Sequence, residues 1–137
     1  NKLEARILCD SAPFLPPESF SSKTTFMSEA EEYASFLLNK GVQRAYISLG
    51  AEGLFCADKA EHLTIPSFMS EGKFIKNTTG AGDSQTAAIA WSILKNMSLR
   101  ESAKAGIAAA SLCLETEEAV NENISEGVLY ERIREIP

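Results

Sequence analysis

The sequence predicts an α/β fold in which helices pack against a mostly parallel sheet. A helical repeat of apolar residues ends at Gly41, and Val42–Leu49 follows it at once with the apolar density of a buried parallel strand. A second, alanine-rich helix runs from Asp83 to Leu94, directly after a glycine-rich turn. Helices and strands that alternate in this way are typical of an α/β sheet.

The length of the chain predicts a single domain. Its 137 residues are enough to bury one hydrophobic core, so residues 1–137 are expected to form one α/β domain. Hydrophobic residues make up 45% and charged residues 23% of the chain, which is ordinary for a globular protein and argues against disorder.

The charge and the cysteines exclude several classes of partner. A net charge of −6 argues against nucleic acid or an anionic membrane as a partner, because both would repel the chain. No segment has the run of about 18 apolar residues that a membrane helix needs. The three cysteines, Cys9, Cys56 and Cys113, have no metal-ligand spacing. We therefore expect buried, reduced thiols in a cytoplasmic protein.

The first part of the chain is predicted as a helix, a loop, a second helix and two strands. Leu3–Leu8 is compatible with a short helix, and residues 10–25 contain the prolines of a loop. Ser28 and Glu31 have the spacing of a capping box that opens the second helix. After the strand that ends at Leu49, Leu54–Ala57 is the next predicted strand.

The second part of the chain is mainly helical. His62–Phe68 and Lys73–Lys76 are predicted as short strands, and Ser98 with Glu101 forms another capping box. The helix that Ser98 opens is rich in small residues, so we expect it to pack closely against the preceding helix. A last helix is predicted at 125–135.

The strongest candidate site is the turn Asn77–Asp83. Gly80, Ala81 and Gly82 lack bulky side chains, and the N–H groups at the start of the following helix form a cradle for an anion. Asp83 beside this cradle has the chemistry to accept a hydroxyl proton while the N–H groups stabilise a transferring phosphoryl group. The alternative is that Asp83 only caps the helix, and the local sequence favours neither interpretation.

Two shorter motifs accompany this turn. Asn1 and Glu4 form an Asn-x-x-Glu motif, which is also an ordinary way to open a helix. Ser48, Gly50 and Gly53 form a Ser-x-Gly-x-x-Gly motif, whose glycines would equally suit a hairpin that needs positive φ angles.

In this order, the motifs resemble the landmarks of the ribokinase-like (PfkB) carbohydrate kinases. Asn77–Ala90 is similar to the second signature of that family, and serine replaces the usual threonine in the Ser48 motif. The resemblance implies a three-layer α/β/α, Rossmann-like fold that uses ATP and Mg²⁺ to phosphorylate a sugar or a nucleoside.

The resemblance also implies roles for individual residues. Asp83 would be the catalytic base, and the amides of Gly80, Ala81 and Gly82 would stabilise the transferring group. Glu4 would act on Mg²⁺ through water. The implied nucleotide-binding residues are Asn1, Ser48, Gly50, Gly53 and Gly82.

The resemblance covers only the C-terminal half of the family's fold. In these kinases the sugar pocket and the lid come largely from the N-terminal half, so we expect that half of the same kinase to be a partner and residues 1–137 alone to be inactive. A second copy of the chain, in a homodimer, is a further expected partner.

An acidic segment, Glu115–Asn121, follows the helix that Ser98 opens. Its carboxylates lie close to the negative end of the helix dipole, so a compensating charge is expected. The family resemblance offers a monovalent cation such as K⁺, with Asn77 and Thr79 nearby. A solvated loop is the other explanation, and it is the usual one for a run of surface charge.

The same segment, continued by Asn123 and Ile124, resembles the Glu-Thr-Val-Asn-Pro ending of pseudouridine kinases. Glu122 replaces the proline, and Ala119 stands where threonine is more usual. This resemblance implies pseudouridine as the acceptor and a pseudouridine-5′-phosphate glycosidase as the neighbour in its pathway.

Two alternatives remain at this point. One is another ribokinase-like acceptor, such as ribose, a hexose or adenosine, and the other is a non-catalytic nucleotide-binding domain. Among the other conspicuous residues, His62 is interpreted as a surface or packing side chain and Trp91 as a core anchor.

Overall fold

A computed structural model describes residues 1–10 and 26–137 of the chain, so the predicted loop at 10–25 lies almost entirely outside the described residues. In chain order the elements are α1 (Lys2–Asp10), α2 (Phe26–Asn39), β1 (Arg44–Ser48), the 3₁₀ turn η2 (Gly50–Glu52), β2 (Leu54–Asp58), β3 (His62–Ile65), α3 (Ala81–Leu94), α4 (Leu99–Leu114) and α5 (Glu126–Glu135). None of the helices in these two ranges is long and apolar enough to cross a membrane.

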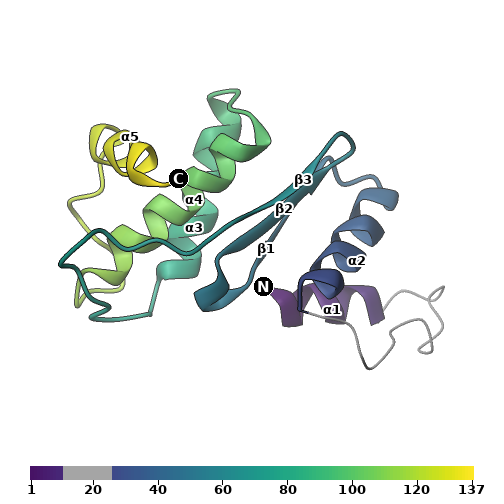
Figure 1. Ribbon diagram of the computed structural model, residues 1–137, viewed down its shortest axis with the longest axis horizontal. Coiled ribbons are helices and arrows are strands. Elements are labelled where there is room, and N and C mark those ends of the chain that lie inside the picture. The colour runs from purple at the N-terminus through teal and green to yellow at the C-terminus, as the bar shows by residue number, and fades with distance from the viewer. Residues whose placement is uncertain (11–25) are drawn as a thin grey trace.

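The elements form three layers, as Figure 1 shows. Helices α1 and α2 cover one face of the sheet, and α3, α4 and α5 lie on the other face. The predicted α/β/α arrangement is therefore confirmed.

The direction of the strands differs from the prediction. The sheet of the described residues has the order β1-β2-β3, and both pairs are antiparallel, with Ser48 opposite Leu54 and Leu54 opposite Ile65. A parallel pair needs a crossover of about a dozen residues or more, whereas only the short turn around η2 separates β1 from β2. The apolar density of β1 indicated burial correctly, but the expected parallel pairing was wrong.

Strand β2 lies in the middle of the sheet and is buried on both faces. Leu54 and Cys56 belong to the core beneath α4, while Phe55 and Ala57 belong to the core beneath α2. Successive side chains of a strand point to opposite faces, so one strand contributes to both cores. Burial raises the pKa of the Cys56 thiol to about 12 and keeps it protonated and inert, and all three cysteines are buried thiols, as predicted.

The predicted starts of two helices are confirmed. Ser98 caps α4 in a capping box, because its hydroxyl accepts from the Glu101 N–H and the Glu101 carboxylate accepts from the Ser98 N–H at 2.8 Å. The Ser28 side chain lies outside the described residues, so the predicted box at Ser28 and Glu31 stays a prediction, and α2 begins at Phe26. Ser125 caps α5, which agrees with the predicted start of that helix.

The predicted strand at Lys73–Lys76 does not form. Phe74 and Ile75 are 74% and 58% exposed, so this segment offers no buried face to a sheet. Its backbone is instead held by a bond from the Lys76 N–H to the Leu114 carbonyl at 2.8 Å. The segment between β3 and α3 therefore crosses beside the end of α4.

Helices α3 and α4 pack closely, as their small residues predict. A Cβ at Gly106 of α4 would lie 2.9 Å from the Cγ1 atom of Ile89 on α3, so only glycine fits there without movement. Trp91 of α3 packs against the same core and meets Tyr130 of α5 edge to face at a centroid distance of 5.4 Å. This agrees with its interpretation as a core anchor.

Candidate functional site

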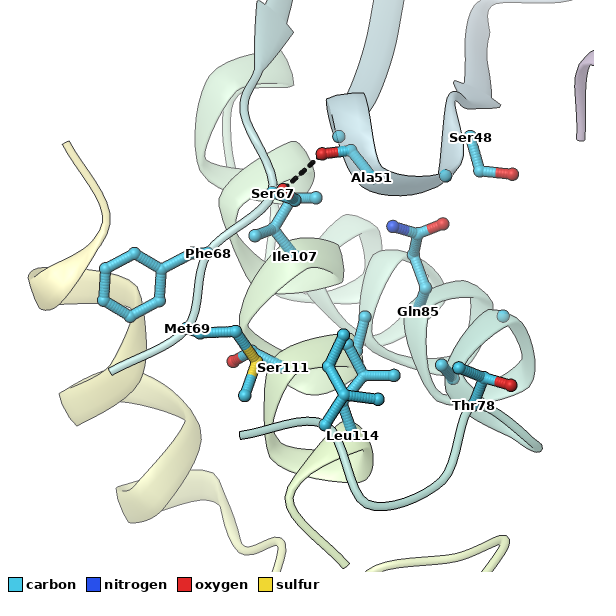
Figure 2. A pocket seen from close by; sticks show the side chains of 16 residues that line it. Ser48, Ala51, Ser67, Phe68, Met69, Thr78, Gln85, Ile107, Ser111 and Leu114 are labelled. Atoms are coloured by element: carbon cyan, nitrogen blue, oxygen red, sulfur yellow. Dashed lines mark hydrogen bonds between the residues drawn. The ribbon is translucent and has the colours of Figure 1, made fainter. Parts of the chain in front are cut away.

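Two cavities open between the sheet and helix α3. The first, called here the apolar cavity, has a volume of about 440 Å³. It is lined by Ser48, Gly50, Ala51, Gly53, Ser67, Phe68, Met69, Ile75, Thr78, Ala81, Gly82, Gln85, Ile107, Ala110, Ser111 and Leu114. Figure 2 shows Ile107, Ser111 and Leu114 of α4 on one side and Ser48 and Ala51 at the β1–β2 turn on another.

The second, called here the polar cavity, has a volume of about 410 Å³. It is lined by Asn1, Glu4, Tyr46, Ser48, Leu54, Gly82, Asp83, Gln85, Thr86 and Ile89. Ser48, Gly82 and Gln85 line both cavities. The two cavities therefore adjoin, and one elongated ligand would have access to both.

The three predicted motifs meet at this junction. Asn1 and Glu4 reach the polar cavity from α1, Ser48 from the end of β1, and Gly82 and Asp83 from the first turn of α3. These residues lie far apart in the sequence, and the fold brings them to one cavity.

Asp83 does not cap its helix. The N-cap position of α3 is Gly80, which has a left-handed φ of 81° and receives no side-chain hydrogen bond. Asp83 lies in the first helical turn, and its exposed side chain lines the polar cavity. The capping interpretation is therefore wrong, and the carboxylate remains available to a ligand.

The Asn1 motif opens a helix and also lines the site. The Asn1 side-chain oxygen accepts from the Glu4 N–H at 3.0 Å, which is the bond of an N-cap residue, and Asn1 Nδ2 donates to Glu4 Oε1 at 2.9 Å. The local interpretation is thus correct, and it does not compete with a role in the cavity. Both side chains line the polar cavity.

The glycines of the Ser48 motif are required by the hairpin. Gly50 and Gly53 have φ angles of 63° and 109°, and a Cβ at Gly53 would lie 2.1 Å from the Ile65 carbonyl oxygen. The turn that they allow forms a wall of the apolar cavity, where the Ser67 hydroxyl donates to the Ala51 carbonyl, as Figure 2 shows.

The glycine-rich turn, Asn77–Asp83, packs against the acidic loop that follows α4, Glu115–Asn121. The Asn77 side chain accepts from the Thr79 N–H at 2.9 Å and donates to the Glu117 carbonyl at 2.8 Å. The Cys113 thiol donates to the carbonyls of Thr79 at 3.6 Å and Ala119 at 3.4 Å. The predicted cation-site residues Asn77 and Thr79 are therefore placed against this loop, beside the two cavities.

The carboxylates of the acidic loop differ in what balances their negative charge. Glu117 and Glu118 are exposed to solvent, as the solvated-loop explanation expects. Glu115 is instead paired with Arg132 of α5, whose Nη1 lies 2.7 Å from Glu115 Oε1. Arg132 was not among the predicted site residues, because nothing in its local sequence links it to Glu115. Within 1–10 and 26–137, no three His, Cys, Asp or Glu side chains are arranged to hold a metal ion.

Gln85 and Tyr46 are among the lining residues that the sequence analysis did not predict. Gln85 lines both cavities, and Figure 2 shows its amide extending toward the β1–β2 turn. Tyr46 lines the polar cavity, and its buried hydroxyl has no hydrogen-bond partner in the described structure. Each lies close to a predicted site residue on the same element, and this spacing could have identified it from the sequence. Tyr46 shares a strand face with Ser48, and Gln85 follows Asp83 by less than one helical turn.

Comparison with known proteins gives a consistent result. Residues 4–126 match the profile of the pfkB family carbohydrate kinases. The chain is 28% identical over 116 residues to the 1-phosphofructokinase of Bacillus subtilis (strain 168), a match that covers 83% of this chain and 37% of that relative. The chain thus spans little more than a third of the length of this curated relative.

Solved structures share the fold. Phosphofructokinase-2 from Escherichia coli in complex with potassium matches with a TM-score of 0.69 and 23% identity, over 81% of this chain and 35% of that one. Arabidopsis thaliana ribokinase complexed with ribose and ATP matches with a TM-score of 0.68 and 24% identity, over 80% and 35% of the two chains. At these identities the likeness concerns the fold.

Proposed function

Because the chain belongs to the pfkB family of carbohydrate kinases, we propose that it forms the nucleotide-binding part of an ATP-dependent kinase that phosphorylates a hydroxyl group of a sugar or nucleoside. The observation that carries this proposal is the junction of the two cavities at Ser48, Gly82 and Gln85. A nucleotide has an apolar ring system at one end and phosphates at the other, and the two cavities differ in the same way.

The adenine ring would occupy the apolar cavity, and the phosphates would pass Gly82 into the polar cavity. A Cβ at Gly82 would meet no atom within 4 Å, so the backbone there is open to a ligand. The amides of Gly80, Ala81 and Gly82 remain the proposed donors to the transferring group, although the Ala81 N–H also makes a long bond of 3.4 Å to the Thr78 carbonyl.

Asp83 would act as the general base. Its carboxylate would accept the proton of the acceptor hydroxyl as that oxygen forms a bond to the γ-phosphorus. The bond between the γ-phosphorus and its bridging oxygen breaks, and ADP leaves. The acceptor would enter the polar cavity from the side of Asp83, since the apolar cavity holds the base.

The polar cavity fits magnesium bound to a nucleotide. Mg²⁺ prefers oxygen ligands and keeps several waters, and it is usually held by one or two carboxylates together with substrate phosphates. Among the described residues, Glu4 and Asp83 are the carboxylates that line this cavity. Glu4 would act through water, and the ion would neutralise charge on the phosphates. A monovalent cation such as K⁺ is proposed beside the carbonyls of Thr79 and Ala119, which converge on Cys113.

The test of this function is Asp83→Asn in the complete protein. Phosphoryl transfer is expected to fall by about 10²–10⁴-fold, the usual contribution of a general base, while the Kd for Mg-ATP stays within a few-fold. Asp58→Asn is the matched control, because Asp58 lies at the far end of β2 and accepts from the N–H groups of its own turn, which asparagine also does. Unchanged turnover in Asp83→Asn would contradict the assignment of Asp83 as the general base.

Among acceptors we propose pseudouridine, with a pseudouridine-5′-phosphate glycosidase acting on the phosphorylated product. The support is the sequence of the acidic loop, Glu115–Asn121, although several of its contacts have structural roles, such as the bond from Asn121 Nδ2 to the Leu112 carbonyl. A panel of pseudouridine, ribose, adenosine and hexoses, phosphorylated or not, tests the choice by kcat/KM. A higher value for any of the others would replace pseudouridine as the acceptor.

We also propose that the N-terminal half of the same kinase covers α1. Leu3, Ile7 and Leu8 on this helix are 65%, 54% and 59% exposed, beside the Asn1 and Glu4 side chains of the polar cavity. Residues 1–137 alone are expected to bind Mg-ATP weakly and to phosphorylate no acceptor. Robust turnover by this segment would contradict the need for a second half.

A further inference from the structure

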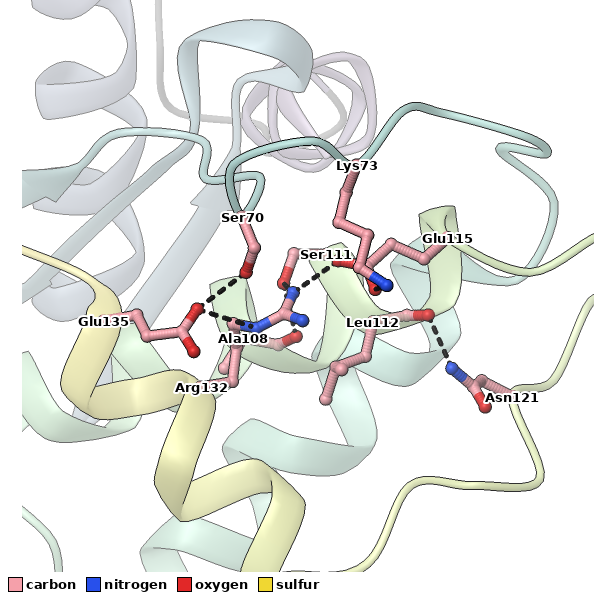
Figure 3. Close-up of polar contacts among 9 residues, drawn as sticks. All are labelled: Ser70, Lys73, Ala108, Ser111, Leu112, Glu115, Asn121, Arg132 and Glu135. Carbon is pink, nitrogen blue, oxygen red and sulfur yellow. Dashed lines mark hydrogen bonds and ion pairs between the residues drawn. The ribbon is translucent and has the colours of Figure 1, made fainter.

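A buried arginine lies behind the wall of the apolar cavity. Arg132 of α5 is only 8% exposed, and its Nη1 donates to the Ser111 hydroxyl at 2.8 Å and to Glu115 Oε1 at 2.7 Å. Its Nε lies 3.3 Å from Glu135 Oε2. Figure 3 shows the guanidinium between these groups, with α4 on one side and the segment that carries Ser70 and Lys73 above it.

The same network reaches the segment 66–76, which crosses beside the end of α4. The Ser70 hydroxyl donates to Glu135 Oε2 at 2.6 Å, and Lys73 Nζ lies 3.9 Å from Glu115 Oε2. Each of the two carboxylates therefore joins Arg132 to a residue of this segment. One guanidinium thus links α5, the end of α4 and segment 66–76.

Two of these linked elements, α4 and segment 66–76, form part of the wall of the apolar cavity. Met69 and Ile75 of segment 66–76 line it, and so does Ser111, which contacts Arg132 directly. Ser111 also donates to the Ala108 carbonyl at 2.8 Å, so its hydroxyl is engaged on both sides and keeps its orientation. The position of the cavity wall thus depends on contacts of Arg132, a residue that does not line the cavity.

Helix α5 has other means of docking. Leu129 and Ile136 are buried in the core beneath α4, and Tyr130 meets Trp91 of α3. Apolar burial of this kind is sufficient to hold a helix on its neighbours. A buried charge is an unusual addition, because a guanidinium taken out of water is costly unless several acceptors surround it.

We propose that Arg132 is a positioning residue for the apolar cavity, which holds segment 66–76 against α4 so that the cavity keeps the width of its ligand. The proposal rests on the assignment of this cavity to the adenine end of Mg-ATP. Arg132 touches no ligand in this account and acts through Ser111, Glu115 and Glu135.

The first test is Arg132→Met in the complete protein, with Arg134→Met as the matched control. Arg134 belongs to the same helix and is exposed. Arg132→Met is expected to weaken Mg-ATP binding by about tenfold, because the cavity wall is no longer held in position, while the KM of the acceptor stays within about twofold. Hydrogen exchange is expected to accelerate at the amides of Lys73 and Lys76, which are bonded to the Ser70 and Leu114 carbonyls. Arg134→Met should change neither quantity.

A second variant separates positioning from stability. Arg132→Met alone leaves Glu115 without its closest partner, so the single variant is expected to lose stability as well. Arg132→Met combined with Glu115→Gln removes the unpaired charge and should recover the thermal midpoint. The proposal requires that this double variant still binds Mg-ATP weakly and still exchanges rapidly at Lys73 and Lys76. Recovery of affinity together with stability would overturn it.

Separate measurements test the proposed function and the positioning role of Arg132. If the wild-type protein does not bind Mg-ATP, the proposed function is wrong. The exchange measurement needs no ligand, so unchanged protection at Lys73 and Lys76 in Arg132→Met overturns the positioning role by itself. If the wild type binds Mg-ATP and Arg132→Met binds it equally well, only the positioning role is wrong.

Discussion

Gly80 lies directly against Ala119, and a Cβ at Gly80 would come within 1.8 Å of the Ala119 carbonyl oxygen. The φ angle of 81° at Gly80 is also one that other residues rarely adopt. Two constraints therefore select glycine at the position that begins α3. The turn before Asp83 and the acidic loop after α4 consequently hold each other in place.

Replacement of Gly80 by alanine is expected to destabilise the protein strongly. The left-handed conformation costs about 1–2 kcal/mol for a residue with a Cβ, and the contact with Ala119 adds a clash that requires the acidic loop to move. We expect a loss of at least about 2 kcal/mol in the free energy of unfolding, measured by denaturant titration. A loss below about 0.5 kcal/mol would contradict the observed packing.

The neighbouring replacement, Gly82→Ala, should have the opposite effect on stability. Gly82 lies within α3, and no atom lies within 4 Å of a Cβ built there, so alanine is expected to stabilise the helix by about 0.5–1 kcal/mol. The added methyl group would enter the wall shared by both cavities and weaken Mg-ATP binding. A thermal melt combined with calorimetric titration measures both effects. An unchanged affinity for Mg-ATP would contradict the proposal that the phosphates lie beside Gly82.

The capping box of α4 predicts a pH-dependent effect. The bond from the Ser98 hydroxyl, followed by the bond from the Ser98 N–H, lowers the pKa of Glu101 below its ordinary value near 4.5. Because the pKa of Glu101 is lower in the folded state, the capping box stabilises the protein fully at a pH above the ordinary pKa. This stabilisation is lost as the pH falls through the lower pKa of the folded state. Ser98→Ala is expected to cost about 1 kcal/mol at pH 7, and the difference from wild type should shrink only in acid below pH 4.5.

Ser125→Ala is the control for this experiment. Ser125 caps α5 by accepting from the Val128 N–H, and the residue at the position of Glu101 is Val128, which does not titrate. Its replacement should cost stability without the same dependence on pH. Unfolding by denaturant at a series of pH values distinguishes the two caps, and identical pH profiles would contradict the role of Glu101.

Tyr46→Phe is expected to leave the fold intact and to raise the free energy of unfolding by about 1 kcal/mol. The Tyr46 hydroxyl is buried without a hydrogen-bond partner in the described structure, so its removal eliminates a desolvation cost while the ring keeps its packing. Denaturant unfolding measures the change, and Tyr130→Phe is a control on another element. A destabilised Tyr46→Phe would mean that the hydroxyl has a partner, such as an ordered water, in solution.

The sequence by itself determined the features that depend on neighbours within a few residues. The α4 cap at Ser98, the helix after the glycine-rich turn and the burial of β1 were all predicted, because capping bonds and apolar periodicity are local. The residues of the three motifs were also recognised. The fold brings five of these residues to one cavity: Asn1, Glu4, Ser48, Gly82 and Asp83. The catalytic role of Asp83 remains a prediction for the Asp83→Asn experiment.

Only the tertiary structure decided the relationships between distant segments. Apolar density predicts that a strand is buried but carries no strand direction, so the antiparallel sheet emerged from the fold, together with the short connections. The same is true of Gly80 against Ala119 and of Arg132 beside Glu115. In each pair the energy comes from a contact between residues on different elements, and no local pattern of either segment specifies its partner. The wall of the candidate nucleotide cavity is such a case, since it depends on an arginine that lies outside it.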